Sequence, residues 1–163
     1  MSKKQVADHV AFPGGVFDVE VIRDGPHGPV VIERRRSPNL VVNTGKRQMW
    51  RMVTGLQTAL WTQMRIGTCG AAPDSADTNV RSPVTGTIET LDTKSLLSGG
   101  RTLQLVLSYA SGDGSKSATG IKEVAVLNTA GTPGGSALAL ATFTAVNKTT
   151  ADKLKITYSV RTT

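Results

Sequence analysis

The sequence predicts a mainly β protein, folded as an antiparallel β-sandwich or barrel (jelly-roll-like) with one short amphipathic helix. Two observations predict this fold class. Short segments in which apolar and polar residues alternate recur along most of the 163 residues, and turns rich in glycine, proline and serine separate them. Only one segment has the apolar spacing of an amphipathic helix. Strands that follow one another without intervening helices favour antiparallel sheets.

The first elements are an extended arm and a hairpin. Residues 1–15 are expected to form the arm, which ends at Pro13-Gly14-Gly15, and residues 16–163 to form a single domain. The segment Val16–Arg23 alternates with period 2, as expected for a half-buried strand. The residues of Asp24–Pro29 favour a turn, and residues 30–32 resume an extended chain. These segments therefore predict a β-hairpin.

The helix is predicted over Gly45–Leu56. Asn43 or Thr44 can serve as its N-cap. Its apolar residues share one face, and their simplest role is to pack the helix on a sheet as part of the core. Alternatively, part of this face forms a contact between subunits. The residues of the face are Met49, Trp50, Met52, Val53 and Leu56.

Strands and turns account for the rest of the chain. The alternation is clearest in the last strand, where Leu154, Ile156, Tyr158 and Val160 are expected to point inward. No internal repeat or linker divides the domain. The predicted strands are Gln63–Gly67, Thr85–Leu91, Arg101–Tyr109, Ile121–Leu127, Ala137–Val146 and Lys153–Arg161.

The charge is strongly positive and favours an acidic partner surface, nucleic acid or anionic lipid. The formal net charge is +7. The densest basic group is Arg34-Arg35-Arg36, which is either a solvated strand end or a contact with a partner. Nucleic-acid binding by stacking needs aromatic residues among the basic ones, and the nearest, Phe17 and Trp50, fall on apolar faces. A protein partner is therefore ranked above nucleic acid.

No residue pattern indicates catalysis or a metal or cofactor site. His9, His27 and Cys69 lack the spacing of metal ligands, and the histidines are interpreted as solvated residues. Cys69 has no local base and is expected to be a small buried hydrophobe. The acidic residues Asp74, Asp77 and Asp113 are expected to cap turns.

The single cysteine, with the absence of an apolar run, predicts a soluble protein made in a cytoplasm, without a disulfide or a membrane span. The motif Gly112-Asp113-Gly114-Ser115-Lys116-Ser117 lacks the spacing of a phosphate loop and precedes a strand. The protein is therefore predicted to be non-enzymatic.

Four segments together resemble a group of small virion structural proteins of tailed bacteriophages. The residues 40–53 (LVVNTGKRQMWRMV) are similar to the group's strand, N-x-G and helix, and residues 65–80 (RIGTCGAAPDSADTNV) to its Gly-rich strand end and loop. The residues 120–128 (GIKEVAVLN) resemble its E-V-G-L strand, and residues 141–160 its closing hairpin. The chain departs from the pattern at Cys69, Val80 and Ala125, where glycine, leucine and glycine are usual.

The resemblance implies a β-rich, non-enzymatic building block of a virion, made in the host bacterial cytoplasm. The first hypothesis is a capsid decoration (cement) protein, a trimer or dimer that clamps neighbouring capsomers of the major capsid protein. The alternative is a tail component such as a baseplate, collar or fibre-attachment module whose arm adds a strand to a neighbour. A carbohydrate- or nucleic-acid-binding β-domain ranks third. The expected partner contacts are Lys3, Lys4, Phe12, Arg34, Arg35 and Arg36.

Overall fold

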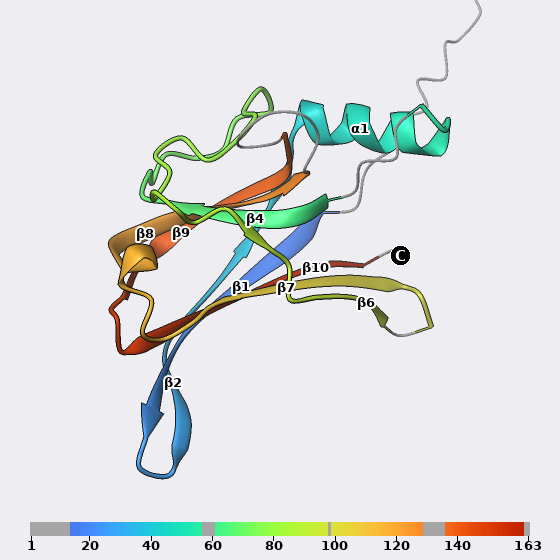
Figure 1. Cartoon of the computed structure of the whole chain (residues 1–163). Helices are drawn as coiled ribbons and strands as arrows, with labels where there is room; N and C mark the ends of the chain where they lie inside the picture. Colours follow the sequence, from blue (N-terminus) through green and yellow to red (C-terminus); the bar gives the residue numbers. More distant parts are fainter. Residues whose placement is uncertain (1–13, 57–60, 98, 129–135, 162–163) are drawn as a thin grey trace, which may run out of the picture.

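The chain folds into a β-sandwich of two antiparallel sheets (Figure 1). A computed structural model describes residues 14–56, 61–97, 99–128 and 136–161. The first sheet has the strand order β2-β1-β10-β7-β6 and the second β3-β9-β8-β4-β5. In these ranges both sheets keep two free edges, so the fold is a sandwich and not a closed barrel.

The first and last strands of the fold lie side by side in the first sheet, because β10 pairs with both β1 and β7. Three hairpins, β1-β2, β6-β7 and β8-β9, supply half of the other neighbouring pairs. The strands of the first sheet are β1 (Gly15–Gly25), β2 (Gly28–Pro38), β6 (Thr93–Leu97), β7 (Thr102–Tyr109) and β10 (Asp152–Arg161). Those of the second are β3 (Leu40–Val41), β4 (Trp61–Gly67), β5 (Glu89–Thr90), β8 (Ala118–Asn128) and β9 (Ala137–Lys148).

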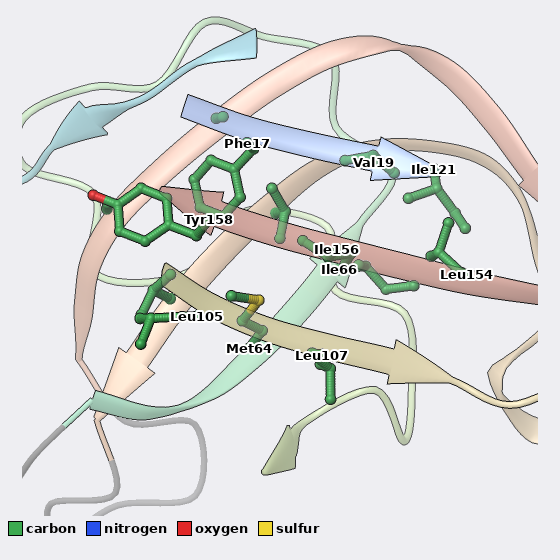
Figure 2. Packing of buried hydrophobic residues seen from close by; sticks show 14 of the residues in the cluster. Phe17, Val19, Met64, Ile66, Leu105, Leu107, Ile121, Leu154, Ile156 and Tyr158 are labelled. Atoms are coloured by element: carbon green, nitrogen blue, oxygen red, sulfur yellow. The ribbon is translucent and has the colours of Figure 1, made fainter. Parts of the chain in front are cut away.

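The core lies between the sheets, and Figure 2 shows its side chains coming from strands of both. The alternation predicted for β10 is confirmed, since Leu154, Ile156 and Tyr158 are buried; Val160 is half-buried. Phe17 of β1 packs on Tyr158, with ring centroids 4.6 Å apart. Burial of each large apolar side chain contributes about 1.5–3 kcal/mol, so these rows hold the sheets together.

The second sheet is covered on its outer side as well. A smaller apolar cluster there joins Val80 of the loop after β4 to Ala125 and Leu127 of β8 and to Leu140 of β9. Consequently β8 is buried continuously over its last six residues instead of alternating. The loop that covers this face is held in place by hydrogen bonds to the buried carboxylate of Glu123 on β8.

The helix α1 (Asn43–Val53) begins two residues earlier than predicted. Its N-cap is Val42, and no side chain caps it. The predicted capping by Asn43 or Thr44 is therefore wrong. The Thr44 hydroxyl instead donates to the carbonyl of Ala137 at 2.9 Å, which ties the helix to β9. Thr44 thus forms a hydrogen bond with a distant strand and not the capping bond with its own helix.

The helix packs through its first turn and extends past the end of the sandwich (Figure 1). Gly45 is its one buried residue, and a Cβ there would lie 2.3 Å from the carbonyl oxygen of Leu138. Met49 is half-buried against the core. The interpretation of the whole apolar face as core is wrong for three residues beyond Met49, because the helix there extends past the edge of the sheets. The residues exposed there are Trp50, Val53 and Leu56.

The region before β7 departs most from the predicted strands. Of the predicted Thr85–Leu91, only Glu89–Thr90 forms a strand, β5, whereas the Thr87 hydroxyl closes a turn by donating to the Val84 carbonyl at 2.7 Å. The sequence did not predict β6, which is mostly exposed. A strand with neither face buried has no alternating pattern, so its residues carry no signal of it.

Candidate partner-binding surface

The β1-β2 hairpin projects from the sandwich (Figure 1). The predicted turn is confirmed, since β1 ends at Gly25 and β2 begins at Gly28, whose φ of 109° suits glycine. The pairing register shifts between Val21 and Ile22. Such a bulge bends and twists a strand. The part of the hairpin beyond it is the hairpin tip, here residues 22–32.

The hairpin tip exposes three consecutive β-branched apolar residues. Val30, Val31 and Ile32 have 55%, 48% and 44% of their surfaces exposed. They lie on β2, an edge strand of the first sheet. Exposed apolar side chains on both faces of a projecting edge strand are typical of a protein-binding segment, because burying them against another protein removes apolar area from water.

Two of the three predicted arginine contacts lie on the outer face of the first sheet. Arg34 lies 3.5 Å from both Asp18 and Glu20 on β1, and Arg36 lies 4.0 Å from Asp18. Both arginines remain mostly exposed. Exposed pairs of this kind contribute at most about 1 kcal/mol each, so the guanidinium groups can exchange partners at little cost.

The third arginine, Arg35, points to the other face of β2. Its guanidinium donates to Glu33 at 3.4 Å and to the carbonyl of Ala145 on β9 at 3.5 Å. The structure therefore brings Arg34 and Arg36 together and places Arg35 apart from them, because successive side chains of a strand point to opposite faces. The remaining predicted contacts, Lys3, Lys4 and Phe12, lie outside the described residues, as does most of the arm.

An ion pair between the exposed Arg23 and the buried Asp152 lies where the projecting part of the hairpin begins. Arg23 of β1 donates to both oxygens of Asp152 on β10, with Nε–Oδ1 at 2.8 Å and Nη2–Oδ2 at 3.3 Å. Asp152 is buried and also accepts from the backbone N–H of Thr149. The hydrogen bond from Arg23 is the main cause that lowers the pKa of Asp152 to about 2. The pair couples the projecting hairpin to the centre of the sheet.

Glu123 of β8 is a residue whose role the sequence did not reveal. It is buried, and Oε1 accepts from the backbone N–H groups of Cys69 (3.2 Å) and Ser82 (2.8 Å), while Oε2 accepts from that of Arg81 (3.1 Å). One carboxylate thus binds both ends of the loop that covers the second sheet. A glutamate within an apolar strand was the available signal, because a carboxylate is buried only where donors surround it.

The acidic residues that could have been catalytic or metal-binding groups instead form hydrogen bonds within turns and loops. Asp74 and Asp77 accept backbone N–H groups within their loop, and Asp113 caps a 3-10 turn at Gly114–Lys116, so the predicted capping roles are confirmed. His27 is exposed in the hairpin turn, whereas His9 lies outside the described residues. Cys69 is half-buried, not buried as predicted, because its loop lies at the surface.

Neither a metal-binding group of side chains nor a membrane-spanning helix occurs in the described ranges. The acidic, cysteine and histidine residues there do not gather in threes. The one α-helix, at 11 residues, is too short to cross a bilayer. Comparison with known proteins found no matching family model, no matching curated protein and no matching solved structure.

Proposed function

We propose that this protein is a structural component of a bacteriophage virion, and specifically a decoration protein that binds neighbouring capsomers on the outside of the head. One structural observation carries the proposal: the hairpin tip offers the exposed apolar residues Val30, Val31 and Ile32 on a projecting edge strand. Such a surface suits insertion between other proteins. The sequence resemblance to virion proteins supplies the choice of partner.

The hairpin combines an apolar tip with a charged base. Arg34 and Arg36 lie next to the tip along β2 and are mostly exposed. In a complex, the apolar residues would supply most of the affinity, while the arginines would select an acidic partner surface and speed association. The net charge of +7 acts in the same direction.

Stabilisation of the shell would follow from mass action. A protein that binds only the assembled, expanded lattice shifts the equilibrium toward that lattice. Many copies, each making weak contacts, act together if the protein is a symmetric oligomer, for which a trimer or dimer is proposed.

The test is binding of the purified protein to tailless, expanded heads, followed by co-sedimentation. The proposal expects saturable binding at many regularly spaced sites per head, reduced at high salt. Binding confined to one end of whole virions, with none to tailless heads, would overturn the head assignment. That result would favour the alternative, a tail component such as a baseplate, collar or fibre-attachment module.

A further inference from the structure

The strand β6 forms the edge of the first sheet that lies opposite to β2 (Figure 1). Among the described residues, no strand pairs with its outer side. An edge strand presents unpaired backbone N–H and C=O groups, so the surface that fits it best is another strand. Apolar side chains occupy both faces of β6, since Leu96 is 70% exposed on one face and Leu97 is 41% exposed on the other. An added strand would pair the backbone and cover both leucines.

The other three sheet edges formed by the described residues are less suited to pairing. The edges of the second sheet, β3 and β5, have two residues each. On β2, Pro29 lacks an N–H group, and the register with β1 shifts between Val21 and Ile22. Such features hinder the addition of a strand. In contrast, β6 pairs with β7 in one uninterrupted register over its five residues and contains no proline.

The exposed leucine of β6 ends a row of apolar side chains. Leu96 lies opposite Leu103 of β7, and Leu103 lies opposite Val160 of β10. Residues directly opposite on neighbouring antiparallel strands share a face of the sheet. Leu103 and Val160 pack against the core, so the row runs from the interior to the exposed Leu96 at the sheet edge. An apolar side chain on an added strand would extend this row.

We propose that β6 of a second copy of this chain occupies the edge, paired antiparallel about a two-fold axis through Leu96. A two-fold axis perpendicular to the sheet keeps the core-facing sides of both first sheets on the same side. Leu96 then lies opposite Leu96 of the partner subunit, and the two apolar rows become continuous. Leu97 lies opposite Ser95 of the partner subunit. The two first sheets thereby join into one.

The charge on β6 favours this register over its neighbour. Lys94 is the one charged residue of the strand. With the axis at Leu96, the two copies of Lys94 are separated by four residues along the strands, about 13 Å, which exceeds the screening length of about 8 Å at physiological salt. With the axis at Ser95, the separation along the strands is about 7 Å and the like charges repel each other.

This pairing leaves both hairpin tips free. Because β2 is the opposite edge of each sheet, the two hairpins lie at the two outer edges of the joined sheet. With about 4.8 Å between neighbouring strands, they are about 40 Å apart. A dimer of this form would contact two neighbouring capsomers at once, and the first contact would raise the effective concentration for the second. That use rests on the proposed function, whereas the dimer itself does not.

Sedimentation equilibrium of the purified full chain tests the dimer without any capsid. The wild type should show a reversible monomer–dimer equilibrium at concentrations up to about 1 mM. Leu96→Lys and Leu96→Glu should each be monomeric, because like charges would meet at the axis, and their Tm should change by no more than about 2 °C. An equimolar mixture of the two variants should dimerise, because opposite charges would then meet. The matched control is Leu56→Lys on α1, where the side chain is 71% exposed, and it should dimerise as the wild type does.

Several results would overturn the proposal. These are a wild type that stays monomeric at about 1 mM, a trimer, a dimer that Leu96→Lys leaves intact, and a mixture of the two charged variants that stays monomeric. Head binding is measured separately. A dimer that does not bind heads would contradict the proposed function alone, and monomers that bind heads would contradict this inference alone.

A disulfide across the axis tests the register. In a Cys69→Ser background, Leu96→Cys would place two cysteines directly opposite, with Cα atoms about 5 Å apart, a distance that a disulfide can span. Mild oxidation should therefore give a covalent dimer. The matched variant Lys94→Cys, with about 13 Å between the two copies, should stay uncross-linked. Equal cross-linking of the two variants would contradict an axis at Leu96.

Discussion

At the scale of single residues, two buried carboxylates position the surface elements of this protein. Glu123 binds both ends of the loop over the second sheet, and Asp152 binds Arg23 where the projecting part of the hairpin begins. Both are satisfied by several donors, as buried charges must be. Each therefore links the packed core to a segment at the surface, and each leads to a prediction.

Removal of the Glu123 charge should loosen the loop after β4. In Glu123→Gln, the amide NH₂ group faces at least one backbone N–H that the carboxylate accepted, so a destabilisation of about 1–2 kcal/mol is expected. Glu123→Ala leaves three N–H groups without their acceptor and should cost about 3 kcal/mol. Urea denaturation measures both. Faster amide exchange confined to Cys69, Arg81 and Ser82 would confirm the local cause, and unchanged exchange there would contradict it.

The ion pair at Asp152 predicts acid sensitivity between about pH 4 and pH 2. The folded-state pKa of about 2 lies below the ordinary value of 3.8, so the unfolded chain binds more protons in this window. The contribution, at most about 2 kcal/mol, is present above pH 4 and lost as the pH falls toward 2. The Arg23 side chain is half exposed, which reduces it further.

The substitution Asp152→Asn tests this linkage. It should lower the free energy of unfolding by up to about 2 kcal/mol at pH 7, and the difference from wild type should shrink toward pH 2. The exposed Asp24 at the hairpin turn supplies the control Asp24→Asn, for which little change is expected. A difference for Asp152→Asn that stays constant from pH 7 to pH 2 would contradict the assigned pKa.

At the scale of elements, α1 depends on one close approach. Gly45 lets the helix backbone meet the backbone of Leu138, where a Cβ would lie 2.3 Å from a carbonyl oxygen. A backbone atom cannot move aside as a side chain can, so the helix itself would have to shift. The rest of the helix extends past the sandwich, with Val53 and Leu56 79% and 71% exposed.

The substitution Gly45→Ala should therefore destabilise the protein by about 2 kcal/mol, although alanine is the better helix former. The matched control is Gly114→Ala, whose Cβ would make an ordinary contact at 3.4 Å with Thr150. The control should change stability by less than about 0.5 kcal/mol. Thermal unfolding measures both, and a Gly45→Ala variant as stable as wild type would show that the helix packs differently.

The sequence predicts strands well where at least one face is buried and poorly where neither face is. The alternation of β1, β7 and β10 indicates their extents and inward faces, because the pattern itself records burial on one side. The exposed β6 leaves no such record. The apolar face of a helix likewise does not show where the sheet beneath the helix ends. For this reason the pattern wrongly places Trp50, Val53 and Leu56 in the core.

The candidate surface was predicted only in part for a related reason. The run Arg34-Arg35-Arg36 suggested a single basic contact, but period 2 divides it between the two faces of β2. The hairpin was predicted, yet the exposure of Val30–Ile32 depends on where the rest of the sandwich stops. Position relative to distant elements is a tertiary property that local patterns do not contain.

At the scale of the whole molecule, the hairpin projects from a sandwich of two packed sheets. Replacing the exposed apolar residue Val31 by glutamate should weaken binding to heads tenfold or more, because a charge would be buried at the contact. Its Tm should change little, since the side chain is half exposed. Co-sedimentation at several protein concentrations measures the affinity. The matched control, Val53→Glu on the exposed end of α1, should bind as wild type does.

The most direct test of the proposed role of the hairpin is electron cryomicroscopy of expanded, tailless heads saturated with the protein. Regular copies are expected on the outer shell, each with residues 22–32 inserted against a capsomer surface and Arg34 and Arg36 facing acidic side chains. Copies bound with the hairpin tip pointing into solvent would contradict the assigned contact surface, and bare heads would contradict the decoration function itself.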